Sequence, residues 1–202
     1  TKQGGGYGDS RINMRGFDSN NIGILINGIP INDMENGRVY WSNWASLSDV
    51  TQFIQVQRGL GASKLAVNSV GGTMNMITKS TDAIKGGGLY YGIGNDGYSK
   101  AAVNVSTGLM ENGWAVSLAG SRTASTHGYV DATNYEAWAY FVNVSKRIND
   151  NHRLSFTAFG APQWHNQRGQ MHTIQEYRDN QNGTRWNSSY GILNGEIFNG
   201  PY

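Results

Sequence analysis

FIQVQRGLGASKLAVNSVGGTMNMIT, residues 53–78, is the stretch that decides the fold. It begins as an alternating apolar run, breaks at Arg58-Gly59, passes through a segment rich in Gly, Ser and Ala, and breaks again at Gly71-Gly72 before a second apolar run. Two short strands joined by a compact turn-and-helix connection are the simplest interpretation. From about residue 86 the chain instead carries repeated amphipathic strands without a helical pattern between them. The stretch therefore closes a small mixed domain, predicted over residues 1–82, ahead of a large sheet predicted over residues 83–202.

Shorter apolar runs precede this stretch. We expect one strand at residues 11–15 and another at residues 22–26, which is followed by Asn27-Gly28, the dipeptide favoured in tight hairpin turns, and by residues 29–31. Four or so short strands with small helical connections make a compact α+β unit. The connection after the hairpin carries Tyr40, Trp41 and Trp44 among Asn, Ser and Gly, so these aromatics form either a satellite core cluster or a recognition surface.

Four runs after residue 98 alternate between apolar and polar positions, and the alternation keeps the same phase in all four. One face of each run is apolar and the other is small and polar, and Phe141 is the exception because it falls on the polar face. Strands of about ten residues match a tilted crossing of a bilayer. The apolar positions are Ala101, Val103, Val105, Trp114, Val116, Leu118, Trp138, Tyr140, Val142, Val144, Leu154, Phe156 and Ala158.

The connections between these runs differ in length at the two ends. Residues 110–113 and 149–151 are minimal turns, whereas residues 125–136 and 161–202 are long and polar, and the short turn at residues 95–97 is the exception. Tight turns at one end, long loops at the other and aromatics near strand ends are typical of an outer-membrane barrel. A soluble β-sandwich also alternates, but the polar faces here are small and neutral and the chain has only 3 Pro.

Composition excludes several classes. The formal net charge of +2 gives no field for nucleic acid, and the absence of Cys excludes disulfide scaffolds and thiolate metal sites. The chain has no run of about 18 apolar residues, so no transmembrane helix is predicted. The glycine-rich start lacks the Lys-Ser/Thr of a phosphate loop.

No residue pattern predicts catalysis, a cofactor or a metal site. The sequence lacks a Gly-x-Ser-x-Gly elbow, and the histidines have no ligand spacing, so they are interpreted as solvated loop residues. Asp18, Asp33 and Glu35 lack the spacing of a Ca²⁺ loop and are interpreted as solvated acids. We therefore expect a protein that is not an enzyme. The histidines are His127, His152, His165 and His172.

Four motifs in order resemble the plug domain of TonB-dependent outer-membrane receptors. They cover nearly all of residues 9–79, and although each motif is weak alone, their order and spacing together are specific. The chain departs from the family at Leu60, where Pro is usual, and at residues 65–67, where Leu-Tyr-Gly is usual, which affects the shape of that connection. The motifs are Met14-Arg15-Gly16-Phe17, Leu25-Ile26-Asn27-Gly28-Ile29-Pro30, Ile54-Gln55-Val56-Gln57-Arg58-Gly59 and Gly71-Gly72-Thr73-Met74-Asn75-Met76-Ile77-Thr78-Lys79.

The resemblance implies an α+β plug followed by the first strands of an antiparallel transmembrane barrel, and barrels of plugged transporters have about 22 strands. It also implies TonB-driven import of a scarce siderophore, cobalamin, glycan or peptide in a Gram-negative bacterium. TonB would grip a segment expected before Thr1. Arginines matching Arg15 and Arg58 would lock the plug to wall glutamates expected beyond Tyr202, consistent with the bidentate fork that an Arg offers a carboxylate. Ordinary solvated arginines are the alternative.

Further expectations concern ligands and partners. The resemblance orients two plug loops outward, and the aromatic and amide-rich segment 161–202 has the composition of sugar or peptide recognition sites, or of any large surface loop. Expected partners are outer-membrane lipid, the external ligand and a surface lipoprotein. The competing hypotheses are a barrel subunit of a secretion or surface-protein complex that does not depend on TonB, and a soluble β-rich adhesin or lectin. The predicted ligand-binding residues are Phe17, Asp18, Ser19, Asn20, Asn32, Asp33, Tyr40, Trp41, Trp44, Trp164, Arg168 and Trp186.

Overall fold

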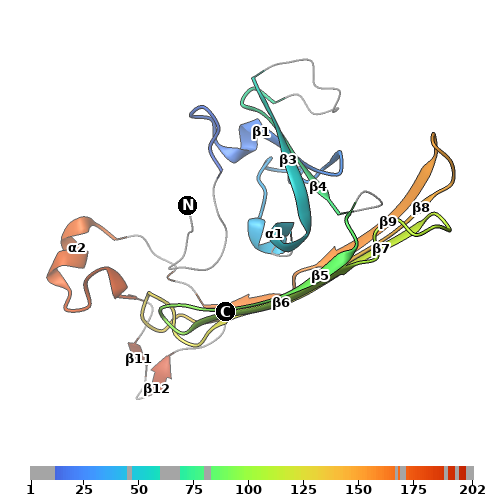
Figure 1. Ribbon diagram of the computed structural model, residues 1–202. Helices are drawn as coiled ribbons and strands as arrows, with labels where there is room; N and C mark the ends of the chain where they lie inside the picture. Colours follow the sequence, from blue (N-terminus) through green and yellow to red (C-terminus); the bar gives the residue numbers. More distant parts are fainter. Residues whose placement is uncertain are drawn as a thin grey trace.

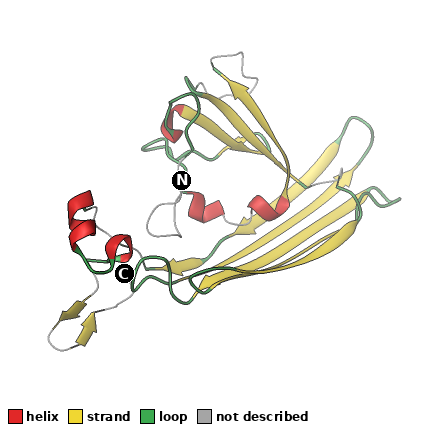
Figure 2. Cartoon of the chain, turned by 60° about the vertical axis from the view of Figure 1, so that its left-hand side comes forward, coloured by secondary structure: helices red, strands yellow, loops and turns green. Residues whose placement is uncertain are grey.

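The computed structural model contains a small mixed sheet that lies against one face of a larger antiparallel sheet (Figures 1 and 2). We call them the plug sheet (β1–β4) and the wall sheet (β5–β10). The structure describes residues 12–44, 47–59, 69–79, 83–166, 168, 172–188, 191–193 and 196–198. The predicted connection at residues 60–68 lies outside this part of the chain.

The plug sheet has the strand order β2-β1-β4-β3. The neighbouring strands β1 and β4 run parallel, while β1–β2 and β3–β4 are antiparallel pairs. The predicted α+β class is therefore confirmed. Every residue of β1 is buried, which explains why this strand reads as a continuous apolar run. The elements are η1 (Ser19–Asn21), β1 (Ile22–Ile26), β2 (Ile29–Pro30), η2 (Trp41–Trp44), α1 (Leu47–Val50), β3 (Thr51–Arg58) and β4 (Gly72–Thr78).

The predicted hairpin turn at Asn27-Gly28 is confirmed. Both residues have positive φ, 52° and 84°, which a two-residue turn of this kind requires and which Asn and Gly tolerate best. The Asn27 side chain donates to Oγ1 of Thr78 at 2.8 Å and accepts from the Thr78 amide at 2.9 Å. The tip of the hairpin is thereby fixed to the end of β4.

The strand predicted at residues 11–15 is wrong over its described part. Met14 and Phe17 instead form an isolated bridge that closes a tight turn. Arg15 and Gly16 occupy the turn with φ of 54° and 83°. A left-handed backbone at two successive residues cannot continue a strand, so the Arg-Gly pair acts as a turn signal and overrides the apolar alternation around it.

The wall sheet is antiparallel and its predicted phase is confirmed. The outward face carries the apolar positions, while the other face carries small and polar residues and is covered by the plug. Phe141, the exception in the sequence, is 1% exposed and faces the plug side. The strands are β5 (Gly86–Ile93), β6 (Tyr98–Ser106), β7 (Trp114–Ser125), β8 (Tyr135–Arg147), β9 (Arg153–Gly160) and β10 (Gln163–His165).

The last part of the chain contains short elements within the long loop that the sequence predicts. β9 and β10 both pair with β8, so they extend the same edge of the wall. No helix among the described residues is long and apolar enough to cross a membrane. The remaining elements are α2 (Ile174–Asp179), η3 (Gly183–Arg185), β11 (Gly191–Leu193) and β12 (Glu196–Phe198).

One hydrophobic cluster fills the plug and reaches the wall. Its buried members come from β1, β4, α1 and the loop before η2, and Phe159 of β9 packs against them. The plug core is therefore completed by a wall side chain. β4 ends at Thr78 and β5 begins at Gly86, on either side of the predicted domain boundary after residue 82. The buried members are Ile22, Ile24, Ile26, Val39, Leu47 and Met76.

Candidate functional site

An ion pair joins the plug to the wall. Nζ of Lys100 on β6 lies 2.7 Å from Oδ1 of Asp49 on α1, and each side chain is only 19% exposed. A part-buried pair of this kind loses little of its attraction to solvent. Sequence reasoning missed it because the partners are 51 residues apart. The sequence feature that could have indicated an ion pair is Lys100, which is the one charged residue in the strand Tyr98–Ser106.

Aromatic side chains form a second contact between plug and wall. The rings of Trp44 and Phe159 have centroids 5.3 Å apart and are tilted by 45°. Trp41 also packs against the plug core, and its indole Nε1 has no hydrogen-bond partner among the described residues. Both tryptophans thus serve at least as packing residues, and ligand contact by them stays a prediction.

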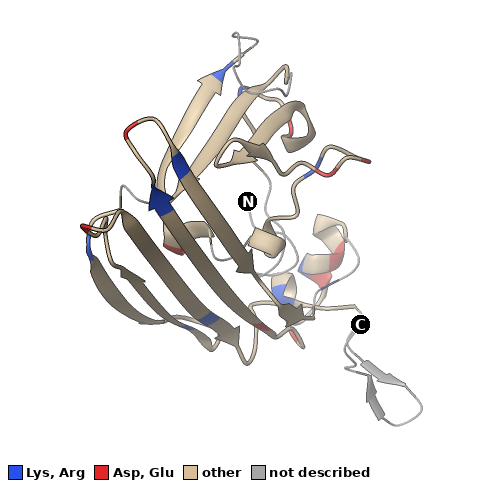
Figure 3. Cartoon of the chain, turned by 90° about the vertical axis from the view of Figure 1, so that its right-hand side faces the viewer, with Lys and Arg blue, Asp and Glu red and all other residues tan. Residues whose placement is uncertain are grey.

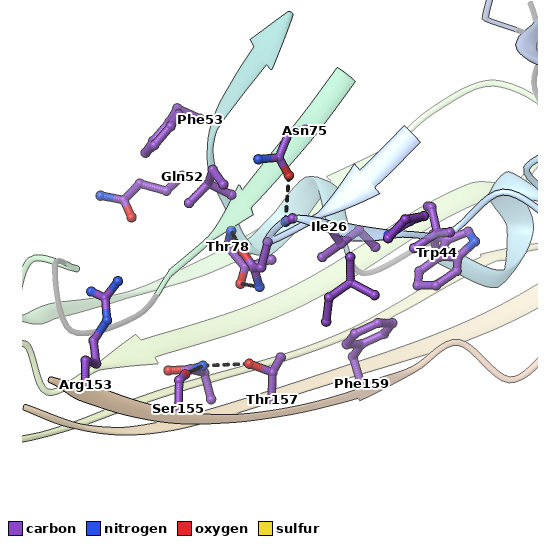
Figure 4. Close-up of a pocket in the computed structure, with 17 residues that line it drawn as sticks. Ile26, Trp44, Gln52, Phe53, Asn75, Thr78, Arg153, Ser155, Thr157 and Phe159 are labelled. Atoms are coloured by element: carbon purple, nitrogen blue, oxygen red, sulfur yellow. Dashed lines mark hydrogen bonds between the residues drawn. The ribbon is translucent and has the colours of Figure 1, made fainter. Parts of the chain in front are cut away.

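A cavity of about 800 Å³ lies between the plug hairpin and strands β8 and β9 of the wall (Figure 4). On the wall side, Nδ2 of Asn143 donates to Ser155 and Thr157 at 2.9 and 2.8 Å. On the plug side, Ile26 and Phe53 provide apolar surface beside polar side chains. The polar lining residues named in Figure 4 are Gln52, Asn75, Thr78, Arg153, Ser155 and Thr157.

The two predicted locking arginines share one corner of the plug. A methyl group on Gly59, which follows Arg58, would lie 3.1 Å from Nη1 of Arg15. Both arginines are exposed, and β3 ends at Arg58, far from the wall sheet (Figure 1). Among the described residues, no carboxylate forms an ion pair with either of them. Their role as a lock stays a prediction.

The two predicted ligand-binding loops of the plug touch each other. A methyl group on Gly37 would lie 3.2 Å from the carbonyl oxygen of Asn20, so the loop with Phe17, Asp18 and Ser19 adjoins the loop after β2. Asn32 holds this second loop in place, because its side chain accepts from the Ile24 amide and donates to the carbonyls of Ile22 and Gly37.

Two further predicted ligand-binding residues lie in the second loop. Asp33 accepts hydrogen bonds from two backbone amides of its own turn, and the hydroxyl of Tyr40 accepts one from Asn36. The Tyr40 ring is nevertheless exposed. Both residues have local structural roles, and their contact with a ligand stays a prediction.

The predicted outer-loop residues separate into two places. Arg168 and Trp186 come together, since Nη1 of Arg168 donates to the carbonyls of Thr184 and Trp186 at 3.0 and 2.9 Å. The same guanidinium lies 4.8 Å from the ring centroid of Tyr177. Trp164 instead lies on β10 opposite Glu136, and its side chain is exposed. The structure thus brings Arg168 and Trp186 together, and ligand contact by all three residues stays a prediction.

Arg185 links three outer segments that are distant in the sequence. It lies on η3, pairs with Asp96 of the β5–β6 turn at 2.8 Å, and stacks 4.9 Å from the ring of Tyr129 in the β7–β8 loop. Its hydrogen bond to Asp96 raises the pKa of Arg185 above its ordinary value. The described residues contain no group of three His, Asp or Glu side chains that could hold a metal ion.

Comparisons with known proteins agree with this architecture. Residues 1–73 match the TonB-dependent Receptor Plug Domain. The chain is 27% identical over 172 residues to the vitamin B12 transporter BtuB of Vibrio vulnificus, an alignment that covers 81% of this chain and 27% of the relative. It is 33% identical over 93 residues to the ferric enterobactin receptor PirA of Pseudomonas aeruginosa, covering 41% and 12% of the two chains. The chain thus spans about a quarter, at most, of the length of these relatives.

Solved structures share the fold. The ferric-catecholate import receptor Fiu of E. coli superimposes with a TM-score of 0.63 at 22% identity, over 82% of this chain and 24% of that one. The copper transporter OprC gives a TM-score of 0.64 at 16% identity, over 83% and 27%. Residues 1–73 thus match the plug domain of TonB-dependent receptors, and the likenesses to solved structures show that the chain has the fold of such a plug followed by barrel strands.

Proposed function

We propose that this chain supplies the plug and the first wall strands of a TonB-dependent importer in a bacterial outer membrane. One observation carries the proposal: the plug core docks through Phe159 onto the polar face of a sheet whose opposite face is apolar and exposed. A barrel wall has this arrangement, with hydrocarbon outside and the plug inside. The relatives are transporters and receptors, which supports transport and not catalysis.

The plug acts as a gate with two states. An external ligand binds between the plug loops and the outer loops, and TonB then pulls on a segment upstream of Thr1 and remodels the plug. The contacts seen here suit a reversible seal, because they include an ion pair, an aromatic contact and polar surfaces around a cavity. Arg15 and Arg58 add a lock to glutamates elsewhere in the wall.

The external site is formed by the adjoining plug loops and by the interlocked outer loops. Phe17 and Tyr40 are its exposed aromatics on the plug, and the folded loop around Arg168 and Trp186 faces the same end of the wall (Figure 1). The cargo is a scarce chelate, corrinoid, glycan or peptide. The names of the relatives, which specify vitamin B12 and ferric siderophores, favour the first two.

A growth assay tests the function. The full-length protein is produced in paired strains with and without TonB, and each strain depends on cyanocobalamin or a ferric catecholate supplied outside. We expect growth only where TonB is present. Growth that does not need TonB would favour the barrel subunit of a surface complex, and extraction of the protein by buffer without detergent would favour a soluble lectin or adhesin.

A further inference from the structure

The cavity of about 800 Å³ between plug and wall has two chemically different sides (Figure 4). Strands β8 and β9 of the wall give it a mainly polar side, and the hairpin and β3 of the plug supply most of its apolar surface. A volume of this size is typical of sites that hold small organic ligands. We call it the plug–wall cavity.

The wall side of the cavity contains a buried amide with an unpaired atom. Asn143 is 2% exposed, and its Nδ2 donates to the hydroxyl oxygens of Ser155 and Thr157 at 2.9 and 2.8 Å. Its Oδ1 has no hydrogen-bond partner among the described residues. A buried polar atom without a partner costs free energy unless water or a ligand satisfies it. Because Asn143 lines the cavity, the missing partner has room to bind there.

The two hydroxyls beside this amide can bond to a ligand as well. Ser155 and Thr157 use their oxygens to accept from Asn143, so the proton of each hydroxyl is left to donate into the cavity. With the amide turned by 180°, the hydroxyls would donate to Oδ1 and Nδ2 would be the unpaired atom. In both orientations this surface requires a partner that donates and accepts, and a ligand hydroxyl does both.

Exposed apolar side chains form the plug side of the cavity. Phe53 of β3 and Ile29 of β2 both line it, and they are 47% and 68% exposed. In Figure 4, Phe53 lies at one end of the cavity, and Trp44 and Phe159 lie at the other. Water alone is a poor occupant beside such surfaces, whereas the C–H face of a sugar ring can pack against an aromatic ring.

The cavity lining carries little charge. Among the described residues that line it, Arg153 alone is charged, and it already takes part in an interaction of its own. Figure 3 shows the charged positions of the wall strands near the strand ends, so the middle of the wall is neutral. Such a lining gives an ionic group little compensation for its loss of water, and it therefore favours a neutral ligand.

We propose that the plug–wall cavity is an internal binding site for a neutral saccharide unit of one or two sugar rings. Hydroxyls of the sugar bond to Asn143, Ser155 and Thr157, while an apolar face of a ring packs against Phe53. Because the bound sugar touches plug and wall together, it stabilises the docked plug. That this sugar belongs to an imported glycan rests on the proposed function, but its binding in the cavity does not.

Calorimetric titration of the full-length protein, in a detergent without sugar head groups, tests the site. Lactose is the neutral probe and lactobionate is its anionic counterpart, and we expect lactose to bind at least about tenfold more tightly. Asn143→Leu replaces the amide by an apolar group of similar size and should weaken lactose binding at least about tenfold. Asn104→Leu changes another plug-facing asparagine of the wall, outside the cavity lining, and should leave the affinity unchanged. No lactose binding by the parent protein, equal affinity for the two probes, or unchanged lactose affinity in Asn143→Leu overturns the proposal.

Thermal unfolding gives a second measurement of the same site. Lactose should raise the unfolding temperature of the parent protein and of Asn104→Leu, but not that of Asn143→Leu. If Asn143→Leu does not fold, Ser155→Ala with Thr157→Val removes both hydroxyls at nearly constant shape and should weaken lactose binding at least about tenfold. Unchanged binding in that variant overturns the proposal.

The two proposals fail separately. If the growth assay shows no TonB-dependent import while lactose binding depends on Asn143, the proposed function fails and the internal site stands. If TonB-dependent growth is found but lactose binding does not depend on Asn143, the internal site fails and the proposed function stands.

Discussion

Asp49 and Lys100 make the most specific residue-level contact between plug and wall. Removing either charge leaves the other in a site that is 19% exposed. We expect Asp49→Asn or Lys100→Met to lower the free energy of plug unfolding by about 1–2 kcal/mol. A charge-assisted hydrogen bond between part-buried groups contributes more to stability than an ion pair on the exposed surface. Urea titration of the full-length protein, followed by tryptophan fluorescence, measures the change.

A charge swap and a matched acid control this prediction. Asp49→Lys combined with Lys100→Asp should recover part of the loss, since the ion pair is restored with altered geometry. Glu35→Gln removes an exposed acid on the same plug and should change the unfolding free energy by less than about 0.5 kcal/mol. If Asp49→Asn behaves like Glu35→Gln, the pair does not hold the plug.

Asn27 combines a conformational and a hydrogen-bonding role. Its φ of 52° favours Asn or Gly, and its side chain makes two hydrogen bonds to Thr78. Asn27→Gly should lose only the hydrogen bonds, about 1–2 kcal/mol of unfolding free energy, and Asn27→Ala should lose about 1 kcal/mol more because Ala resists a left-handed backbone. If both variants lose the same unfolding free energy in the urea titration, the left-handed backbone of Asn27 makes no separate contribution to stability.

Arg58 tests the proposed lock. It is exposed and lies at the corner of the plug that it shares with Arg15, away from the wall strands seen here. Arg58→Glu in the full-length protein should make cells more sensitive to large antibiotics, because a glutamate would repel a wall carboxylate and loosen the plug. Glu35→Gln should leave the antibiotic sensitivity unchanged. If cells that produce the Arg58→Glu protein are no more sensitive to large antibiotics, Arg58 does not take part in the lock.

At the scale of elements, α2 depends on a capping box. The Thr173 amide and hydroxyl donate to Oε2 of Glu176, and the Glu176 amide donates back to Oγ1 of Thr173. The hydrogen bond from the Thr173 backbone, and then that from its side chain, lower the pKa of Glu176 below its ordinary 4.5. The cap is therefore at full strength above pH 4.5 and is lost as the pH falls through the lowered pKa of Glu176 in the folded loop.

Acid should thus loosen this outer loop before the sheets. We expect amide exchange of residues 174–179 to accelerate below pH 4.5, after correction for intrinsic rates, while β7 and β8 stay protected. Glu176→Gln, whose neutral side chain can still accept a hydrogen bond, should remove the pH dependence of this protection. If the dependence persists in that variant, another group controls the helix.

The strands could be predicted from the sequence because their signal is local. Alternation fixed the face of each wall residue, and even Phe141 was recognisable as an exception before the plug beneath it was known. Asn27-Gly28 likewise specified its own turn. The strand at residues 11–15 failed because Arg15 adopts a left-handed backbone, which apolar periodicity does not report.

The contacts around the candidate site could not be predicted from the sequence, because they form only when elements distant in the sequence come together. Asp49 and Lys100 lie on different sheets and meet only when plug and wall dock, so no local spacing reveals them. Arg168 was expected at a ligand, yet its guanidinium holds the backbone of its own loop, a role that composition cannot distinguish from recognition.

At the scale of the whole molecule, the proposed barrel orientation places the outward face of the wall against the bilayer, and this face carries a band of matching height. Arg122 lies 5.5 Å from the ring of Trp138 near one end of β7 and β8, and Lys146 lies over Trp114 at the other. Trp114 and Arg122 are eight residues apart on β7, about 26 Å along the strand at 3.3 Å per residue. With a tilt of about 40° this gives a height of about 20 Å, close to the apolar band of outer-membrane barrels.

Leu118 lies halfway between these two polar levels and is 43% exposed on the outward face. Leu118→Arg should therefore lower the free energy of unfolding in phosphatidylcholine vesicles by about 2–4 kcal/mol, because it places a charge at the bilayer centre. Leu154→Arg is the matched control, since Leu154 pairs with Lys146 at the level of the headgroups and should cost at most about 1 kcal/mol. Guanidinium titration of the full-length protein in vesicles measures both values. Equal costs at the two depths would mean that this face does not lie against hydrocarbon, and the orientation of the wall would have to be reversed.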